Sequence, residues 1–428
     1  MRILLIGAGG VGDAVAKIAA KRSFYEHFIV SDYDQGRADK TIAWIEDRYG
    51  SEVASRFSSL KIDASNAASM AQLIKENNVD YVINAVEPKF VPTIFSACFT
   101  AKVNYLDMAL SLSEPHEHDP FHKTGIKLGD SQYALNEQWQ RAGKLALIGI
   151  GVEPGLSNIF AKYAADNLFG EIDEVSVKDG GNLVVKNDKG EEIFAPSFSI
   201  WTTIEECLNP PTLFEKRKGW FTTEPFSEPE VFEFPDGIGA VECVNVEHEE
   251  ISMLPRTMKV GRVTFKYGLG SDFIGVLKTL HRLGLDATKP VRVRSSQGPV
   301  EVAPRDVVVS VLPDPASIGP RMTGKTCAGV LVTGKSKDGT PRATYIYHVA
   351  DNAETMAAIE AQAVVAQTAF NPLIALELIS QGIWQGVGVM GPEEFDPKPF
   401  LDLMASSTGY QEKWVAQERL PASPLRLP

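Results

Sequence analysis

The sequence predicts an α/β fold, with an N-terminal doubly wound parallel sheet and a second α+β domain built on a mostly antiparallel sheet. The first part is predicted by short apolar runs that alternate with segments of helical periodicity up to about residue 155. The second is predicted by later segments in which apolar and polar residues alternate, such as Arg262–Tyr267. We therefore expect domains at 1–155 and 156–350, with helices over 351–428 that return to the first domain.

The chain opens with a predicted strand, a glycine-rich turn and a helix. Arg2–Ile6 is a short apolar run typical of a strand covered on both faces, and Gly7, Gly9 and Gly12 follow it as GxGxxG. In a Rossmann fold these glycines permit a tight turn, a close approach of a pyrophosphate, and close packing of helix on strand. The following helix would offer free N–H groups to the phosphates. A tight turn without a ligand is the alternative.

The next predicted strand makes nucleotide binding the better interpretation. HFIVSDYD ends near Asp32, which lies 20 residues after Gly12. An acid there can accept hydrogen bonds from the ribose hydroxyls and repels a 2′-phosphate, so we expect NAD, while Arg37 keeps NADP as an alternative. Ligands of such sheets bind beyond the carboxyl ends of the strands. The cofactor-binding candidates from these positions are Gly7, Gly9, Gly10, Val11, Gly12, Asp32, Asp63, Ala64, Asn84, Ala85, Val86 and Asp107.

The remaining elements follow the same patterns. Helices are expected over 36–50, 66–77 and 134–143, and strands near 58–64, 79–86, 103–109 and 145–150. In the second half, the segments VTFKYG, DVVVSVL, CAGVLVTG and ATYIYHVA are predicted to be strands. The chain after Asp351 is strongly helical, and a break is expected near Asn371–Pro372 because proline interrupts a helix.

Composition excludes several classes of protein. The formal net charge of −13 argues against nucleic-acid binding, which would need a basic face. The 4 cysteines are widely spaced and form no CxxC pair, as is typical of a reduced cytoplasmic protein without disulfides. No signal peptide precedes the first strand, and no stretch reaches the roughly 18 apolar residues of a membrane helix. We expect a cytoplasmic protein that binds neither nucleic acid nor membrane.

Other catalytic chemistry has little support in the sequence. His116, His118 and His122 share one polar segment, but no cysteine or regularly spaced acid completes a metal site, so no metal is expected. Neither GxSxG nor GxxxxGK[ST] occurs, which leaves hydride transfer by a bound cofactor as the expected chemistry.

One acidic stretch suggests a substrate. Residues 221–250 contain 9 acids and no lysine or arginine, which fits either a solvated loop or a pocket wall for a cationic amine. Arg256 follows and can bind a carboxylate through two parallel hydrogen bonds, so a cleft with both features suits an amino acid or polyamine. Trp201 could offer a π face to an ammonium group or simply be a core residue. The candidates for substrate recognition or proton transfer are Glu153, Glu205, Glu206, His248, Arg256 and Trp201.

Several segments together resemble the saccharopine dehydrogenase superfamily, which includes saccharopine reductases, carboxynorspermidine synthases, bacterial homospermidine synthases and lysine 6-dehydrogenases. They are ILLIGAGGVG, VINAV, NYLDMA, IGIGVEPGLSN and GVGVMGPEEFDPKPFLDLM. The resemblance implies that Ala85, Val86, Gly151, Val152 and Pro154 line the nicotinamide end of the cofactor site. It also implies an α+β dimerisation domain and therefore a homodimer. Where relatives often have Asp-Pro-Gly this chain has Glu153–Gly155, and TAFNPL replaces their T-G-x-P-A, so the resemblance does not identify the substrate.

The predicted function is NAD(P)-dependent oxidation or reduction at a C–N bond of a basic amino acid, opine-like conjugate or polyamine, as in saccharopine dehydrogenases or carboxynorspermidine synthases. Two alternatives stay open. One is a deaminating dehydrogenase of the lysine 6-dehydrogenase type, and the other is a regulatory protein that binds NAD(H) without turnover.

Overall fold

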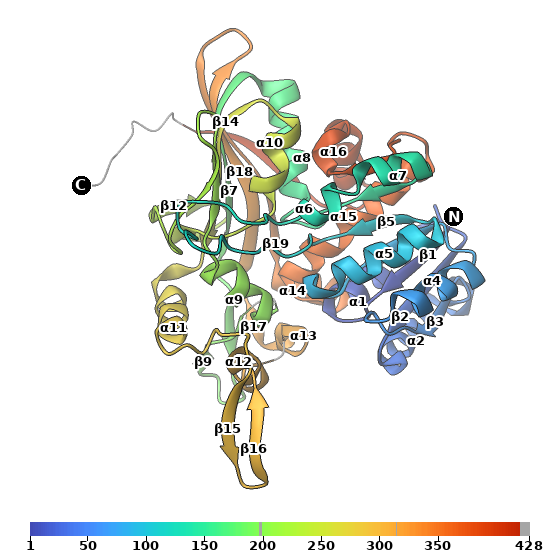
Figure 1. Cartoon of the computed structure of the whole chain (residues 1–428). Helices are drawn as coiled ribbons and strands as arrows, with labels where there is room; N and C mark the ends of the chain where they lie inside the picture. The colour runs from blue at the N-terminus through green and yellow to red at the C-terminus, as the bar shows by residue number, and fades with distance from the viewer. Residues whose placement is uncertain (197–198, 314, 420–428) are drawn as a thin grey trace.

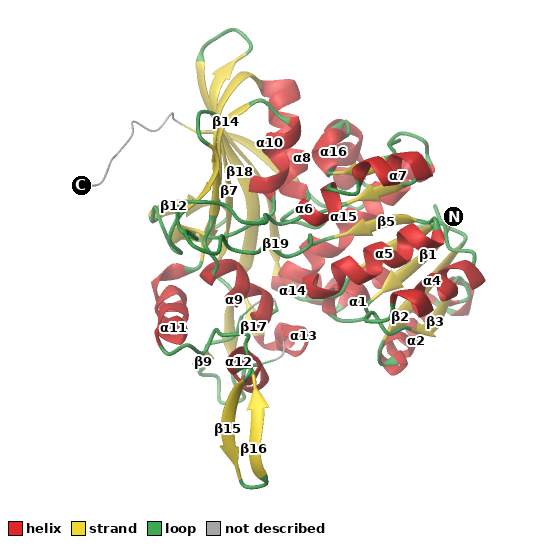
Figure 2. Ribbon diagram, viewed as in Figure 1, coloured by secondary structure: helices red, strands yellow, loops and turns green. Residues whose placement is uncertain are grey.

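The computed structural model describes residues 1–196, 199–313 and 315–419. It has two sheets side by side, a parallel sheet within helices and a larger sheet that carries most of its helices on the side of the parallel sheet (Figures 1 and 2). The predicted fold class is confirmed. The first sheet is Rossmann-like and the second is mixed and mainly antiparallel.

The parallel sheet has seven strands in the order β20-β6-β5-β4-β1-β2-β3. Strands β1 to β6 follow the order of a doubly wound nucleotide-binding sheet, and β20 extends it at the β6 edge. The strands are β1 (Arg2–Ile6), β2 (His27–Asp32), β3 (Phe57–Lys61), β4 (Tyr81–Asn84), β5 (Asn104–Asp107), β6 (Leu145–Leu147) and β20 (Gly388–Met390). The helices that accompany them are α1 (Gly10–Ala19), α2 (Gln35–Tyr49), α3 (Ser51–Ala54), α4 (Ala67–Glu76), α5 (Val91–Ala101), α6 (Asp130–Tyr133) and α7 (Asn136–Ala142).

The second sheet has nine strands among the described residues, and of these only β7 and β14 pair in parallel. Alternation in β14 places Val263 and Phe265 in the core, as the sequence pattern predicts. The strands are β7 (Phe169–Gly181), β10 (Thr212–Glu215), β11 (Gly219–Thr222), β12 (Glu230–Phe234), β13 (Gly239–Asn245), β14 (Val260–Gly268), β18 (Lys325–Ser336), β19 (Pro341–Asp351) and β21 (Trp414–Arg419). Helices α8 (Leu156–Tyr163), α9 (Ile200–Leu208), α10 (Glu250–Thr257) and α16 (Pro397–Ala405) pack near it, and β8 (Val184–Lys186), β9 (Glu192–Ile193) and β17 (Met322–Thr323) form a small separate sheet.

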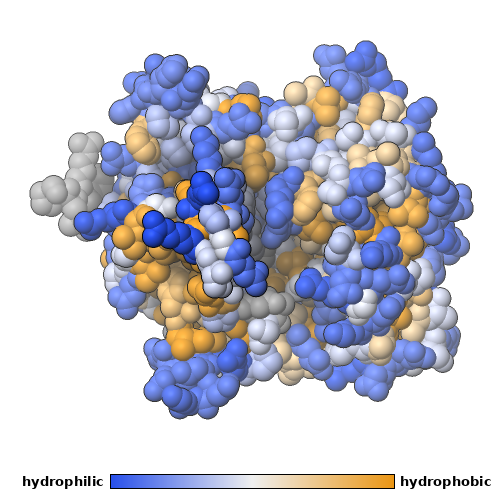
Figure 3. All heavy atoms as spheres, turned by 60° about the horizontal axis from the view of Figure 1, so that its bottom comes forward, coloured by the Kyte–Doolittle hydropathy of each residue, from blue (hydrophilic) through white to orange (hydrophobic). Residues whose placement is uncertain are grey.

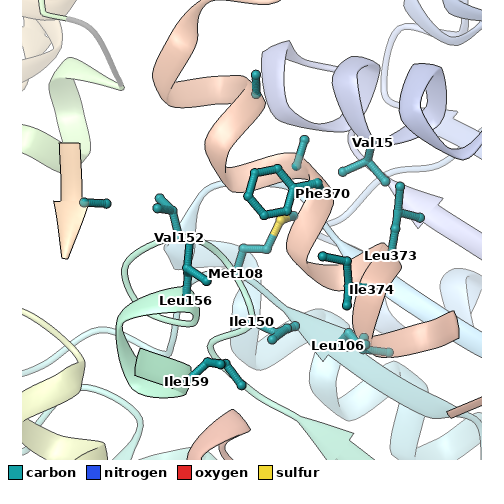
Figure 4. Close-up of a cluster of buried hydrophobic side chains, with 14 of the residues drawn as sticks. Val15, Leu106, Met108, Ile150, Val152, Leu156, Ile159, Phe370, Leu373 and Ile374 are labelled. Carbon is teal, nitrogen blue, oxygen red and sulfur yellow. The ribbon is translucent and has the colours of Figure 1, made fainter. Parts of the chain in front are cut away.

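The two sheets share a core through helix α15 (Ala363–Ser380). Figure 4 shows Phe370, Leu373 and Ile374 of this helix among side chains of α1, α8 and the ends of the parallel strands. Among the described residues α15 is the one helix long and apolar enough to cross a membrane, and 83% of it is buried inside the protein. Its apolar composition therefore reflects its place in the core.

The predicted break near Asn371–Pro372 is wrong, because α15 continues through Pro372. The side-chain amide of Asn371 donates to the carbonyl of Gln367 at 2.7 Å and lies 3.5 Å from that of Thr368, where the missing proline N–H would have bonded. The chain breaks earlier instead. Helix α14 (Asn352–Ile359) ends at Glu360, which has a left-handed φ of 54°.

The predicted strand at DVVVSVL is also wrong. Residues Pro304–Val311 form helix α12, with the proline in the first turn together with Asp306. Proline and an acid favour a helix start, and Val308 and Val309 pack against the core from the helix. Tertiary packing has overruled the strand propensity of the valines.

Helix α12 belongs to a segment inserted between β14 and β18. The segment contains α11 (Gly270–Arg282), α13 (Pro315–Ile318) and a ribbon formed by β15 (Val291–Ser295) and β16 (Gly298–Val302), which projects from the molecule (Figures 1 and 2). Figure 3 turns this end toward the reader and shows hydrophobic side chains beside hydrophilic ones on its surface. The residues of β15 are all exposed.

Candidate active site

A cavity of about 800 Å³ lies where the carboxyl end of the parallel sheet meets the second domain. One half is lined by the loops after the parallel strands, and the other by the second sheet and α9. The inserted segment and the first turns of α15 contribute Val309, Leu312 and Thr368 to its wall. Ligands of doubly wound sheets bind at this end of the strands.

The first half fits a dinucleotide. Gly9 precedes α1, and a Cβ on it would meet nothing within 4 Å, so the backbone is open to a pyrophosphate at the helix N-terminus. A Cβ on Gly12 would lie 1.8 Å from the carbonyl oxygen of Gly7, so the third glycine is needed for packing. The predicted cofactor residues that line the cavity are Gly7, Gly9, Gly10, Val11, Asp32, Asp63, Ala64, Asn84, Ala85, Val86, Val152 and Pro154.

Asp32 ends β2 at the place where a ribose acid belongs. Its Oδ2 accepts the Ala8 N–H at 2.8 Å and its Oδ1 accepts the Asp34 N–H at 2.9 Å, which fixes the carboxylate beside the glycine turn. The remaining lone pairs are available for ribose hydroxyls. Arg37 also lines the cavity and is exposed, so it stays the candidate partner for a 2′-phosphate.

The second half of the cavity is acidic. Carboxyl groups reach it from four places in the chain: the loop after β6, strand β7, helix α9 and the turn before α10. The titratable and aromatic side chains that line it are Glu153, Asp179, Trp201, Glu206, His248, Glu249 and Tyr267. Among the described lining residues the cationic side chains are Arg37, at the cofactor end, and His248.

His248 is held in place by its neighbours. Its ring stacks on Phe265 with centroids 3.8 Å apart, and its Nδ1 lies 2.6 Å from Oε2 of Glu250. Ser157 donates to the other oxygen of Glu250 at 2.6 Å. Burial lowers the pKa of His248, but the carboxylates of Glu250 and Glu249 outweigh it and raise its pKa to about 10. His248 is therefore an imidazolium at neutral pH.

Burial has the opposite effect on the carboxyl groups of the cavity, because it raises their pKa values. Burial raises the pKa of Glu206 to about 8 and that of Asp179 to about 6. Burial also raises the pKa of Glu153 well above its usual range, and Asp179 and Glu250 add to the shift. With one nearby imidazolium for several acids, this wall attracts cations.

Five predicted residues do not line the cavity. Gly12 and Gly151 support its loops, and the buried carboxylate of Asp107 accepts the N–H of Gly149 at 2.6 Å and the amide of Gln132 at 2.7 Å. Glu205 pairs with Arg305, whose guanidinium lies 4.8 Å from the ring centroid of Trp201. Arg256 pairs with Asp130 and lies over the ring of Tyr133, outside the cavity. Trp201, Glu153, Glu206 and His248 line it.

The acidic stretch at 221–250 divides into two parts. Glu228 and Glu230 pair with Lys266, Arg262 and Lys178 and do not line the cavity, whereas Glu249 does. His248, Glu249 and Glu250 bring ligand atoms within 4.8 Å of one another, as a metal site would, but His248 is hydrogen-bonded to Glu250 and paired with Glu249, and these contacts already explain the proximity.

Sequence reasoning missed Asp179 and Tyr267. Both end strands of the second sheet and are followed by glycine, at Gly180 and Gly268. An acid at the end of an alternating strand was the available signal, but nothing in the sequence shows that β7 and β14 are neighbours.

The fold and the cavity together define a class of protein: an NAD(P)-dependent oxidoreductase with an acidic substrate chamber. The chain belongs to the saccharopine dehydrogenase family. Residues 3–147 match the family described as Saccharopine dehydrogenase NADP binding domain, and residues 151–410 match the Saccharopine dehydrogenase C-terminal domain.

Relatives cover nearly the whole chain. The carboxynorspermidine synthase of Vibrio alginolyticus is 32% identical over 99% of both chains. The carboxyaminopropylagmatine dehydrogenase of Synechocystis is 27% identical over 94% of both chains. Among solved structures, apo saccharopine dehydrogenase (L-Glu forming) from Saccharomyces cerevisiae has a TM-score of 0.66 at 13% identity and covers 98% of this chain and 100% of its own.

These findings confirm the predicted family, the NAD(P) cofactor and the class of reaction. The protein is an oxidoreductase that acts on a C–N bond and interconverts an amine and the corresponding imine. The non-catalytic alternative has no support in the comparisons.

Proposed function

We propose that the enzyme joins a diamine to an amino-acid aldehyde by reductive condensation, so that the C=N bond formed between them becomes a secondary amine. The observation that carries the proposal is the acidic wall of Asp179, Glu206 and Glu249 opposite the dinucleotide half of the cavity. A diamine carries two positive charges at neutral pH and suits such a wall better than a neutral or anionic substrate does.

The names of the relatives support the same substrate class. Carboxynorspermidine and carboxyaminopropylagmatine both contain a carboxyaminopropyl group on the nitrogen of an amine. Disconnecting each molecule at that secondary amine leaves an amine, diaminopropane or agmatine, and the aldehyde analogue of aspartate. We propose that this chain uses the same aldehyde with a diamine.

Each half of the cavity has a separate task. The backbone at Gly9 and the start of α1 hold the pyrophosphate, Asp32 holds the ribose, and we propose that it makes NAD(H) the preferred cofactor. When bound, the cofactor supplies the hydride. Glu206 and Glu249 bind the ammonium group that does not react, and the imidazolium of His248 binds the substrate carboxylate, in the role first predicted for Arg256.

The test is a panel of amines and carbonyl compounds with NADH or NADPH. We expect cofactor oxidation only when a diamine and the aspartate aldehyde are both present, with a condensed secondary amine in the mass spectrum. Formation of NADH from NAD⁺ and lysine or a diamine alone would instead establish the deaminating alternative. Tight NAD(H) binding without turnover of any pair would contradict both.

A matched pair of variants tests the acidic wall. Glu206→Gln keeps the size of a cavity residue but cannot ionise when the diamine binds, and we expect the KM for the diamine to rise about tenfold or more because a charge-assisted hydrogen bond is lost. Glu233→Gln changes an exposed acid of β12 and should leave the KM unchanged. Equal effects of the two would contradict the assignment of Glu206.

Two further proposals depend on the family resemblance. We propose a homodimer, and the exposed valines Val291, Val293 and Val300 of the ribbon support it because an isolated two-stranded ribbon is marginally stable. A monomer mass in light scattering would contradict it. We also propose a cytoplasmic location, supported by 4 cysteines that are all free and buried and tested by cell fractionation.

A further inference from the structure

The proposed function does not assign a proton donor, and two neighbouring carboxyl groups of the cavity are candidates for it. Glu153 lies in the loop after β6, next to the cofactor half, and Asp179 lies near the end of β7. Both line the cavity, and their carboxyl groups are in contact, so that each shifts the pKa of the other. Two carboxyl groups make such a contact only when a proton lies between them, because two carboxylates would repel.

No neighbouring group replaces that proton. Among the described residues no N–H or O–H donor reaches the buried Oε1 of Glu153, and the nearby imidazolium of His248 is hydrogen-bonded to Glu250. The backbone N–H groups of Gly329 and Gly180 contact the pair and help to hold its one negative charge. The titratable groups that influence the pair from the surrounding elements are Glu206, Cys243, His248, Glu250, Tyr267, Cys327 and Tyr345.

The environment separates the two protonation steps. Burial raises the pKa values of both carboxyl groups, and a charge on one of them opposes ionisation of the other, so the pair loses its two protons in separate steps. At neutral pH the pair therefore holds one proton and one negative charge. A pair in that state can accept a proton and can also donate one without a change of structure.

We propose that Glu153 and Asp179 act as one proton-sharing acid that releases water when the C=N bond forms. The inference rests on the proposed condensation and extends it to a step that needs no electrons from the cofactor. Neither the fold class nor the family assignment includes Asp179 in this role.

The proton balance of this step closes without another reactant. The pair takes a proton from the incoming ammonium group, and the neutral amine attacks the aldehyde carbon, which forms the C–N bond and, after a proton moves from nitrogen to oxygen, a carbinolamine. The doubly protonated pair then donates one proton to the hydroxyl group. The C–O bond breaks, water leaves with that proton, and the nitrogen lone pair forms the C=N bond of an iminium ion. The pair is back in its singly protonated state.

The test uses the full-length enzyme without NAD(P)H, with cyanoborohydride to trap the iminium ion formed from diaminopropane and the aspartate aldehyde. We expect the wild-type protein to accelerate trapping, and Asp179→Asn and Glu153→Gln each to lose about a hundredfold or more of that acceleration. The double variant should lose no more than either single one, because the two carboxyls act as a unit. Asp173→Asn changes an exposed acid of the same strand and should behave as wild type.

Two readouts separate a lost proton donor from a damaged site. The dissociation constant for NADH should stay within about twofold of wild type in every variant, because the pair does not hold the ribose or pyrophosphate. Infrared difference spectra of the free enzyme at neutral pH should show one protonated carboxyl group more in the wild type than in the double variant.

Other outcomes overturn the proposal in distinguishable ways. If Asp179→Asn traps the iminium ion at the wild-type rate, or if the single effects add up in the double variant, the pair is not the acid. If the infrared difference is absent, the shared proton is wrong. If the wild type accelerates neither trapping nor turnover with any amine, it is the proposed condensation that fails, and the infrared result still decides the state of the pair.

Discussion

Asp32 is a single residue that lines the nucleotide site and, as proposed above, selects the nucleotide. It accepts two backbone hydrogen bonds, from Ala8 and Asp34, and it places a negative charge where a 2′-phosphate would lie. Asp32→Asn removes the charge and one acceptor. We expect the preference for NADH over NADPH, measured as the ratio of kcat/KM values, to fall by about ten- to a hundredfold.

Asp34→Asn is the control for this prediction, because Asp34 lies two residues further on and caps α2 by accepting the Gly36 N–H at 3.0 Å without lining the cavity. An unchanged ratio in Asp32→Asn, or an equal change in the control, would show that Asp32 does not select the cofactor.

The same scale shows what the sequence can predict of a site. Asp32 could be predicted because a short-range rule links it to the glycine turn, and the structure places it in the cavity. Arg256 was chosen for its charge alone, and its position between Asp130 and Tyr133 depends on a contact 126 residues apart. Asp179 was missed for the same reason, since its partner Glu153 lies in another domain of the predicted chain. When site residues come together from distant segments, no local sequence pattern predicts their contact.

At the scale of elements, the β1–α1 unit separates two kinds of glycine. Gly9 has a φ of −75°, which alanine also adopts, and open space above it, whereas a Cβ on Gly12 would collide with the Gly7 carbonyl. We expect Gly9→Ala to keep the melting temperature of the free protein but to weaken NADH binding about tenfold or more, since the methyl group occupies the phosphate site.

Gly12→Ala, in contrast, should lower the melting temperature of the free protein, because the new methyl group forces helix and strand apart. We expect the free energy of unfolding to fall by about 1–3 kcal/mol. Calorimetry of the two free variants, with titration of NADH, measures both effects. A loss of stability in Gly9→Ala comparable to that in Gly12→Ala would contradict the separation.

Helix α12 forms part of the cavity wall, and the side chain of Arg305 connects it to α9. Arg305 is 6% exposed, pairs with Glu205 of α9 and lies over Trp201, and its Nε donates to the carbonyl of Asp286 at 2.8 Å. Arg305→Lys keeps the charge but loses the planar group that stacks and donates in several directions. We expect backbone amides of 304–311 to exchange about tenfold faster and the KM for the diamine to rise.

Arg292→Lys provides a matched control, because Arg292 is exposed on the ribbon of the same inserted segment. Hydrogen exchange followed by mass spectrometry compares the variants peptide by peptide. If α12 exchanges at the wild-type rate in Arg305→Lys, the helix is held by its apolar contacts and the ion pair has no anchoring role.

The elements that the sequence misassigned also share a cause. The valines of α12 favour a strand and Pro372 favours a helix break, and both preferences are local. Contacts with distant residues reversed the first, and the side chain of Asn371 compensated for the second. Strands β1 to β6 of the parallel sheet were predicted because periodicity, turn chemistry and burial agree there, whereas β20 lies in the C-terminal region that was predicted to be helical.

At the scale of the whole molecule, the buried acids make stability depend on pH. Burial raises the pKa of Glu206 to about 8 and the pKa values of Asp107, Glu247 and Glu393 to about 7. A carboxyl whose pKa is higher in the folded state binds its proton more tightly there than in the unfolded chain. Such a group contributes stability below its unfolded pKa and loses it as pH rises through the folded value, by about 1.4 kcal/mol per unit of pKa shift.

His248 acts in the same direction, because its pKa is raised to about 10 and its contribution is lost as pH rises from its unfolded value through the folded one. We therefore expect the melting temperature of the free enzyme to fall steadily from about pH 5 to about pH 9. A bound diamine replaces the missing protons with fixed ammonium groups, so its stabilising effect should grow with pH, whereas propanediol, which has the same length and no charge, should have none. Scanning calorimetry across this range measures both trends. A melting temperature that rises toward alkaline pH, or a diamine effect that is independent of pH, would show that the buried acids are already ionised in the free enzyme and that a diamine does not replace protons there.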